Sequence, residues 1–168
     1  MRDFVMTSDS VTIGHPDKLC DRISDAVVDA WLADGLRAGV NAECALASGV
    51  AFLSIRSGAQ APVDAAALAR RVVAEAGYDP DGAGHHAMTV ILEHAHDPDL
   101  APERIARGTA GHMVTAFGYA CGWTATGMPA PIEAAHRIAR GLDAGRADGR
   151  LAWLGPDAKA QVAVRFRD

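Results

Sequence analysis

The sequence predicts an α+β fold in which a β-sheet is backed by helices. The chain has 168 residues, of which 49% are hydrophobic and 5% aromatic, a composition typical of a soluble globular protein with a sizeable core. Apolar residues recur at spacings of three and four in three segments, which indicates amphipathic helices. Short β-like segments alternate with these helices in the order βαββαβ, followed by one further helix and strand.

The clearest helix begins at Pro16, because proline fits the first turn of a helix. Gly35 follows the helix as a stop signal. From Val40 to Ile55 the pattern becomes short and β-like, and Gly49 divides it into two strands. The apolar residues that mark the helix are Leu19, Ile23, Ala26, Val27, Ala30 and Trp31.

A second helix opens at Pro62-Val63-Asp64 and ends at Gly77. Met88 to Leu92 follows as a buried strand. From His94 to Gly111 the chain is rich in His, Asp, Pro and Gly and has weak periodicity. We expect a mobile connection there, of the length that often carries function.

The last third of the chain predicts one helix, at Met128 to Leu142, and a terminal strand at Gln161 to Phe166. A short segment at Phe117 to Cys121 is expected to be extended. We therefore expect a first domain over residues 1–100 and the first part of a second domain over residues 101–168. So few elements leave the second domain incomplete, with unpaired sheet edges and an uncovered face.

Composition excludes several classes of function. The net charge is −5, from 16 basic and 21 acidic residues, which argues against nucleic acid or an anionic membrane as a partner. No apolar run approaches the roughly 18 residues that a membrane span needs. The first residues lack the apolar core of a secretory signal, so we expect a cytoplasmic protein. Three separated cysteines without a CxxC pair indicate reduced structural thiols rather than a disulfide framework or a zinc site.

One string with chemical potential is Gly14-His15-Pro16-Asp17-Lys18, where a loop enters the first helix. Helix N-termini favour anions, and His15 and Lys18 would complete a cradle for phosphate. Asp17 offers a hard oxygen ligand for Mg²⁺ beside those phosphates. Taken alone, so short a string favours the simpler interpretation, a helix initiated by proline with Asp17 and Lys18 in solvent.

The second string is Gly155-Pro156-Asp157-Ala158-Lys159, just before the last strand. Taken alone it is typical of an ordinary turn. However, Lys18 and Lys159 are the only lysines among the 16 basic residues, and both lie in turns that contain Asp and Pro. Lysine is a compact charge with rotatable donors, which suits a phosphate that moves.

Further motifs keep their order along the whole chain. They are Met6-Thr7-Ser8-Asp9-Ser10-Val11, Asp21-Arg22-Ile23-Ser24-Asp25-Ala26-Val27, Glu43 before Gly49, Ala76-Gly77-Tyr78, Phe117-Gly118-Tyr119-Ala120, Met128-Pro129-Ala130-Pro131-Ile132 with His136-Arg137, and Trp153-Leu154 with Gln161-Val162. Together with the two strings, this set resembles the S-adenosylmethionine synthetase (methionine adenosyltransferase) family, over the N-terminal domain and the start of the central domain.

The resemblance implies an α+β fold of repeated similar domains and adenosyl transfer from ATP. In this reaction a sulfur nucleophile attacks C5′ of ATP and expels the triphosphate, which is then hydrolysed, so that stabilising charge on the leaving group matters most. The catalytic residues that it implies are His15, Lys18 and Lys159. The residues that it implies for binding are His15, Lys18, Asp157 and Lys159 for ATP, Asp17 for Mg²⁺ and Glu43 for K⁺.

Three positions depart from the family pattern on the amino-acid side of the site. Family members hold methionine there with an acidic residue, a Gln and an Asp, which align with Arg56, His96 and His112. An ammonium group would be repelled by a cation where it was once paired. The alternatives are a strand-end arginine in solvent and a loop histidine of no consequence.

Family members are also more than twice as long. We therefore expect a subunit of a split S-adenosylmethionine synthetase-like enzyme, completed in a hetero-oligomer by a second polypeptide that supplies the missing central and C-terminal domains. One alternative is an adenosyltransferase with a different acceptor, selected by Arg56 and His112. Another is a non-catalytic subunit that stabilises or regulates an intact enzyme, and a third is a truncated product.

Overall fold

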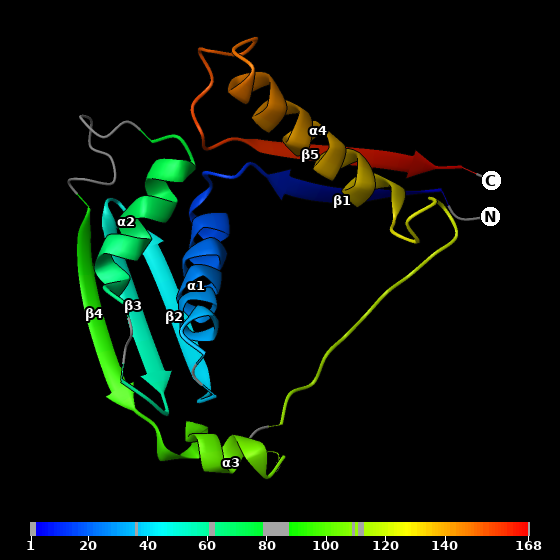
Figure 1. The fold of residues 1–168 in the computed structure, drawn as a ribbon. Coiled ribbons are helices and arrows are strands. Elements are labelled where there is room, and N and C mark those ends of the chain that lie inside the picture. The colour runs from blue at the N-terminus through cyan, green and yellow to red at the C-terminus, as the bar shows by residue number, and fades with distance from the viewer. Residues whose placement is uncertain are drawn as a thin grey trace. The chain divides into compact units, whose positions relative to one another are not determined.

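The computed structural model describes residues 3–35, 37–60, 63–78, 88–108, 110 and 113–167 (Figure 1). Its elements follow the predicted order βαββαβ, then a helix and a strand, and the α+β class is confirmed. The chain folds into two compact units, residues 16–114 and residues 1–15 together with 115–168. The expected domains over residues 1–100 and 101–168 stay a prediction.

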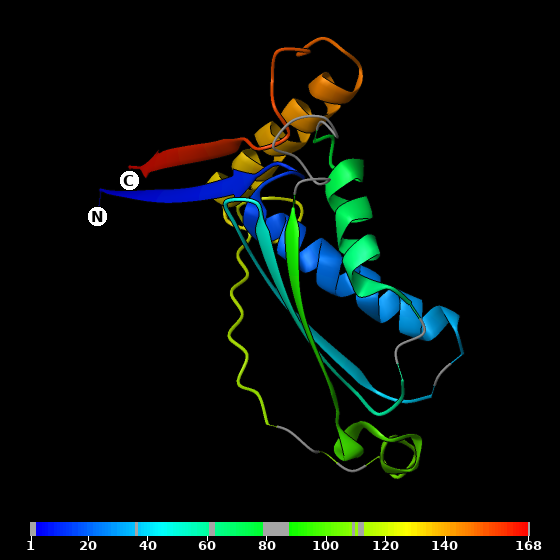
Figure 2. The ribbon, with the colours of Figure 1, turned by 90° about the vertical axis from the view of Figure 1, so that its left-hand side faces the viewer.

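The unit of residues 16–114 is a three-stranded sheet with two helices. Its strands are β2 (Val40–Ala47), β3 (Val50–Ser57) and β4 (Thr89–His96), in the order β2-β3-β4. β2 and β3 are antiparallel, whereas β3 and β4 are parallel. The helices α1 (Pro16–Ala33) and α2 (Ala65–Glu75) pack against each other and against the sheet, as Figure 2 shows.

The core of this unit follows from the periodicity of its elements. On β3, Ala51, Leu53, Ile55 and Ser57 are buried, whereas Phe52 and Arg56 between them are exposed. Alternation of this kind places one face of a strand on the helices and the other in solvent. The buried residues of α1 keep the helical spacing that the sequence predicts: Leu19, Ile23, Val27 and Trp31.

Helix α2 confirms the prediction of a helix opening near Asp64. The Asp64 carboxylate accepts hydrogen bonds from the backbone N–H groups of Ala66 and Ala67, both at 3.0 Å. This N-cap satisfies donors that the first helical turn leaves unpaired. Gly77 then ends the helix with a φ of 99°, a conformation that glycine adopts most readily.

The connection that we expected from His94 to Gly111 has regular secondary structure over its first part. β4 continues to His96, a short 3₁₀ helix η1 covers Pro98–Leu100, and a helical turn α3 covers Pro102–Ala106. Asp97 starts η1, because its carboxylate accepts a hydrogen bond from the N–H of Asp99 at 3.0 Å. Local capping therefore orders a segment whose composition resembles that of a loop.

The second unit pairs the two ends of the described chain. β1 (Phe4–Val11) and β5 (Lys159–Phe166) form an antiparallel pair in which Val11 lies opposite Lys159. The helix α4 (Ala130–Ala147) packs on both strands and buries Ala135 and Ala139. The expected extended segment at 117–121 forms no strand, because none of these residues is hydrogen-bonded into a sheet.

Within the described ranges, no helix combines the length and apolarity that crossing a membrane requires.

Candidate functional site

The two strings that the sequence singles out meet at the ends of β1 and β5. The backbone N–H of Thr12 donates to the carbonyl of Ala158 at 2.9 Å, and that of Gly14 donates to the carbonyl of Pro156 at 3.0 Å. The hydroxyl of Thr12 donates to the Pro156 carbonyl at 2.7 Å and accepts from the Ala158 N–H at 2.7 Å. Segments 144 residues apart in sequence thus lie side by side.

Gly14 permits this approach because it has no side chain. A Cβ atom at position 14 would lie 2.5 Å from Cβ of Pro156 and 2.6 Å from its carbonyl oxygen. Backbone atoms cannot move aside as a flexible side chain can, so a larger residue would separate the two segments.

Asp143 on α4 fixes the same turn from the helix side. Both oxygens of its carboxylate accept from the N–H of Ile13, at 3.1 and 3.3 Å. The N–H of His15 donates to the carbonyl of Thr12 at 3.1 Å, which closes the turn. The half-buried His15 is therefore placed by backbone contacts on both sides of the turn.

Lys159 begins β5 and forms an ion pair with Asp9 of β1. Hydrogen bonding and charge attraction from Lys159 lower the pKa of Asp9. Both side chains are exposed, so the pair is accessible to an incoming anion. A phosphate that bound Lys159 would compete with Asp9, because both offer oxygens to the same ammonium group. Asp157, two residues earlier, is also exposed.

The remaining residues of the two strings begin α1. Asp17 and Lys18 lie in its first turn, and both are exposed. A carboxylate there leaves hard oxygens in reach of solvent, as a Mg²⁺ ligand requires. The assignment of Mg²⁺ to Asp17 stays a prediction. Among the described residues, no group of three or more His, Cys, Asp or Glu side chains is placed to hold a metal.

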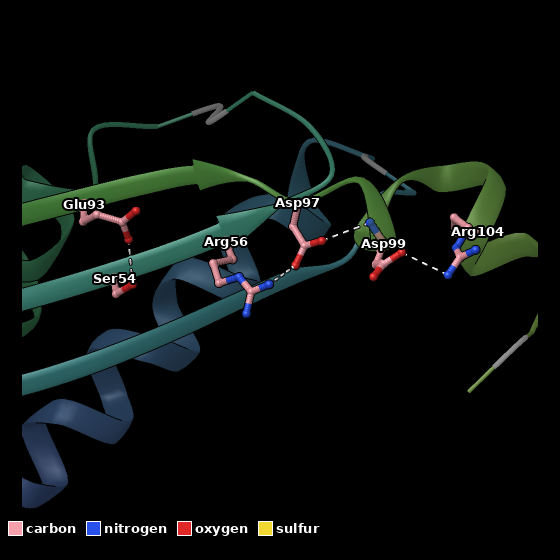
Figure 3. Close-up of polar contacts among 6 residues, drawn as sticks. All are labelled: Ser54, Arg56, Glu93, Asp97, Asp99 and Arg104. Atoms are coloured by element: carbon pink, nitrogen blue, oxygen red, sulfur yellow. Dashed lines mark hydrogen bonds and ion pairs between the residues drawn. The ribbon is translucent and has the colours of Figure 1, made fainter. Parts of the chain in front are cut away.

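Glu43 lies on the face of the sheet that the helices leave uncovered. In the strand register Glu43 is opposite Ser54, and Ser54 is opposite Glu93. The Ser54 hydroxyl donates to the Glu93 carboxylate at 2.8 Å (Figure 3). A row of two carboxylates and a hydroxyl offers only oxygen ligands, the kind that a hard cation prefers. The assignment of K⁺ to Glu43 stays a prediction.

Arg56 lies on the same exposed face as Glu43, and it has a counter-ion. Its Nη2 atom contacts Oδ2 of Asp97 at 2.5 Å (Figure 3). The Arg56 side chain is 59% exposed and that of Asp97 only 12%. His96, next to Asp97, is exposed at the end of β4. The third altered position, His112, lies outside the described residues.

Sequence reasoning missed the residues that hold the candidate site together. Thr12 and Asp143 act through backbone hydrogen bonds, which no local pattern reveals. Asp9 pairs with Lys159 across two strands that are far apart in the chain. Asp97 alone had a local signal, since an Asp directly before Pro commonly starts a turn or short helix.

Comparison with known proteins gives two family matches. The family model for the S-adenosylmethionine synthetase N-terminal domain matches residues 3–97. The model for the S-adenosylmethionine synthetase central domain matches residues 107–168.

Curated relatives match almost the whole chain. S-adenosylmethionine synthase 1 of Rhodospirillum rubrum is 42% identical over 171 residues, which cover 99% of this chain and 45% of the relative. S-adenosylmethionine synthase of Prochlorococcus marinus strain MIT 9313 is 39% identical over 186 residues, covering 100% of this chain and 43% of the relative. That of Synechococcus elongatus is 37% identical, covering 99% and 44%. The chain thus spans less than half the length of these relatives.

Proposed function

The chain belongs to the S-adenosylmethionine synthetase family, and from that premise we propose that it binds ATP and takes part in adenosyl transfer to methionine or a related sulfur nucleophile, with release of triphosphate. The observation that carries the proposal is the pairing of the two strings through Thr12 and Gly14. That pairing brings together the segments that contain His15 and Lys159, which a shared ligand requires.

The proposed roles follow from charge. Triphosphate leaves with several negative charges, and cationic or hydrogen-bonding groups that meet those charges lower the barrier. Lys159 is proposed to exchange its contact with Asp9 for a phosphate oxygen, and His15 to donate a hydrogen bond near the departing oxygen. Lys18 supplies a second ammonium, and Asp157 borders the nucleotide.

We further propose that Mg²⁺ and K⁺ bind at the site, and that this chain supplies some of their ligands. Asp17 offers an exposed carboxylate for Mg²⁺, and Glu43 with Ser54 and Glu93 offers an oxygen-rich row for K⁺. The ions would supply positive charge that offsets the charge of the triphosphate. These donor sets fit hard cations, since every donor is an oxygen.

The nucleotide proposal is tested by binding rather than by turnover. A non-hydrolysable ATP analogue with Mg²⁺ is titrated into the 168-residue chain and its affinity is measured by calorimetry. Lys159→Ala is expected to weaken binding about tenfold, since a charge-assisted hydrogen bond contributes about 1.5 kcal/mol or more. Arg165→Ala is the matched control, because Arg165 of β5 pairs with Asp3, the residue just before β1. Equal affinities for the two variants would contradict the proposal.

The curated relatives are more than twice as long as the matched stretch, so elements beyond these residues would complete the catalytic centre. We propose that a second polypeptide supplies them in a hetero-oligomer.

Two alternatives differ in what the chain contributes. An adenosyltransferase with another acceptor would use the altered positions Arg56, His96 and His112 to select it. A subunit that only stabilises or regulates an intact enzyme would not need Lys18 or Lys159 at all. Alanine at these two lysines would then leave the activity of the complex unchanged.

A further inference from the structure

The segment after β4 is hydrogen-bonded to the end of the sheet. We refer to residues 97–106, which contain η1 and α3, as the cap. The N–H of Asp97 donates to the carbonyl of Ser57 at 2.9 Å, and the N–H of Gly39 donates to the carbonyl of Leu100 at 2.8 Å. These bonds attach the cap to the chain just before β2 and to the last residue of β3.

Close contacts at two glycines fix the position of the cap on the sheet. A Cβ atom at Gly58 would lie 2.0 Å from the carbonyl oxygen of Leu100. A Cβ atom at Gly39 would lie 3.0 Å from Leu100 Cδ2 and 3.3 Å from Ile105 Cδ1. Two glycines thus let the cap approach the backbone at both strand ends.

Asp97 connects the cap to the uncovered face of the sheet. Its Oδ1 accepts from the Asp99 N–H at 3.0 Å, and its Oδ2 contacts Arg56 Nη2 at 2.5 Å. Asp99 in turn pairs with Arg104 at 3.0 Å. Figure 3 shows these side chains as a continuous series from β3 into α3.

We propose that Arg56 is a positioning residue, which holds the cap against the sheet through its ion pair with Asp97. We refer to this ion pair as the latch. The Asp97 carboxylate is largely buried, so loss of its cation would leave a charge with little water around it. Arg56 is largely exposed, so salt can weaken the pair. The latch therefore responds to ionic strength, and an anionic ligand of Arg56 would have to displace Asp97.

Limited proteolysis of the 168-residue chain tests the latch without ATP or an acceptor, so its outcome is separate from that of adenosyl transfer. Trypsin cleaves after Arg104 within the cap and after Arg107 beside it. Arg56→Gln is expected to speed cleavage at these two sites about two- to fivefold, since cleavage follows the population of the open cap. Arg150→Gln, which breaks an exposed pair with Asp148 in the other unit, is the matched control and should change neither site.

Three further measurements decide whether Arg56 acts through Asp97. Asp97→Asn keeps an acceptor for the Asp99 N–H but loses the charge, so adding Arg56→Gln to it should have no further effect. Arg56→Lys should restore slow cleavage. Raising NaCl to about 0.5 M should speed cleavage of the original chain more than cleavage of Asp97→Asn, which keeps the exposed pair of Asp99 and Arg104. Rates are normalised to a short peptide substrate.

An unchanged cleavage rate in Arg56→Gln would overturn the proposal. Equal acceleration by Arg56→Gln with and without Asp97→Asn would also overturn it, because the arginine would then act elsewhere. If Arg56→Gln loses its far-ultraviolet circular dichroism, Arg56→Lys and the salt response of the original chain decide, and the absence of a salt response rejects the latch.

Discussion

Thr12 connects the two chain segments that carry the candidate nucleotide site. Its hydroxyl and backbone N–H contact Pro156 and Ala158 in three hydrogen bonds of 2.7 to 2.9 Å. Thr12 is almost fully buried, and a buried polar group is costly unless its hydrogen bonds are made. The side chain therefore stabilises this one arrangement of the strand ends over others.

Restoring an acidic residue at position 56, as in the family pattern, requires a second change at Asp97. Arg56→Glu alone would bring a second carboxylate against Asp97, and the two like charges would repel each other. Arg56→Glu combined with Asp97→Ser removes that conflict. If methionine is the acceptor that the family pattern implies, the double variant should lower the KM for methionine in the active complex about tenfold, whereas Arg56→Glu alone should not.

Steady-state kinetics with methionine measure this difference, and the KM for ATP is the internal control. An unchanged KM for methionine in the double variant would count against the acceptor hypothesis. A lower KM in the single variant as well would show that Asp97 does not determine the charge at this position.

The site residues found from the sequence are those whose chemistry is unusual in this chain. His15, Asp157 and Lys159 stand in short strings with Pro and Gly, and lysine is rare here. Thr12 and Asp143 could not be found in this way, because their partners are backbone groups of distant residues. The roles of His15, Asp157 and Lys159 as ligands of ATP stay predictions.

At the scale of secondary structure, local signals predicted most elements well. Pro16 begins α1, Asp64 caps α2, and the strands of 40–55 are divided near Gly49, as the sequence indicates. Strand pairing was beyond local reasoning, since β1 pairs with β5 across most of the chain. A two-residue period fixes which face of a strand is buried but not which strand lies beside it.

Packing of α1 on β2 also brings two cysteines together. The charge and hydrogen-bonding capacity of the Cys20 thiol act on the Cys44 thiol. Burial, with a smaller contribution from Cys20, raises the pKa of Cys44 from 9.0 to about 12. At pH 8 the thiolate of Cys44 is then far scarcer than in the unfolded chain, and the thiolate is the reactive form.

We therefore expect iodoacetamide to modify Cys44 at pH 8 far more slowly in the folded chain than in urea, as followed by mass spectrometry of the peptide. Because the folded state keeps this proton longer, Cys44 stabilises the fold fully below pH 9.0, and that contribution falls as the pH rises towards 12. Cys44→Ala should remove this part of the pH dependence of the unfolding free energy. Equally fast modification of folded and unfolded chain would contradict the expectation.

At the scale of the whole molecule, the charged residues proposed to act on the nucleotide differ from those proposed to act on the acceptor. The two lysines lie in the strings that bear on the nucleotide, whereas the departures from the family pattern concern the acceptor. The curated relatives continue for more than half of their length beyond the match. We therefore propose that nucleotide binding depends on residues that this chain has, and we expect catalysis to depend on further residues.

We expect the 168-residue chain alone to release no measurable triphosphate from ATP, because a leaving group of this charge needs more cations than Lys18, Lys159 and His15 provide. Affinity capture of the tagged chain followed by mass spectrometry should identify the completing polypeptide. Triphosphate release by that complex is then measured with methionine as acceptor. In the complex, Lys159→Ala should lower turnover at least about tenfold, whereas Arg165→Ala should not. Robust turnover by the isolated chain would contradict the split arrangement, and full activity of the Lys159→Ala complex would favour a stabilising or regulatory subunit.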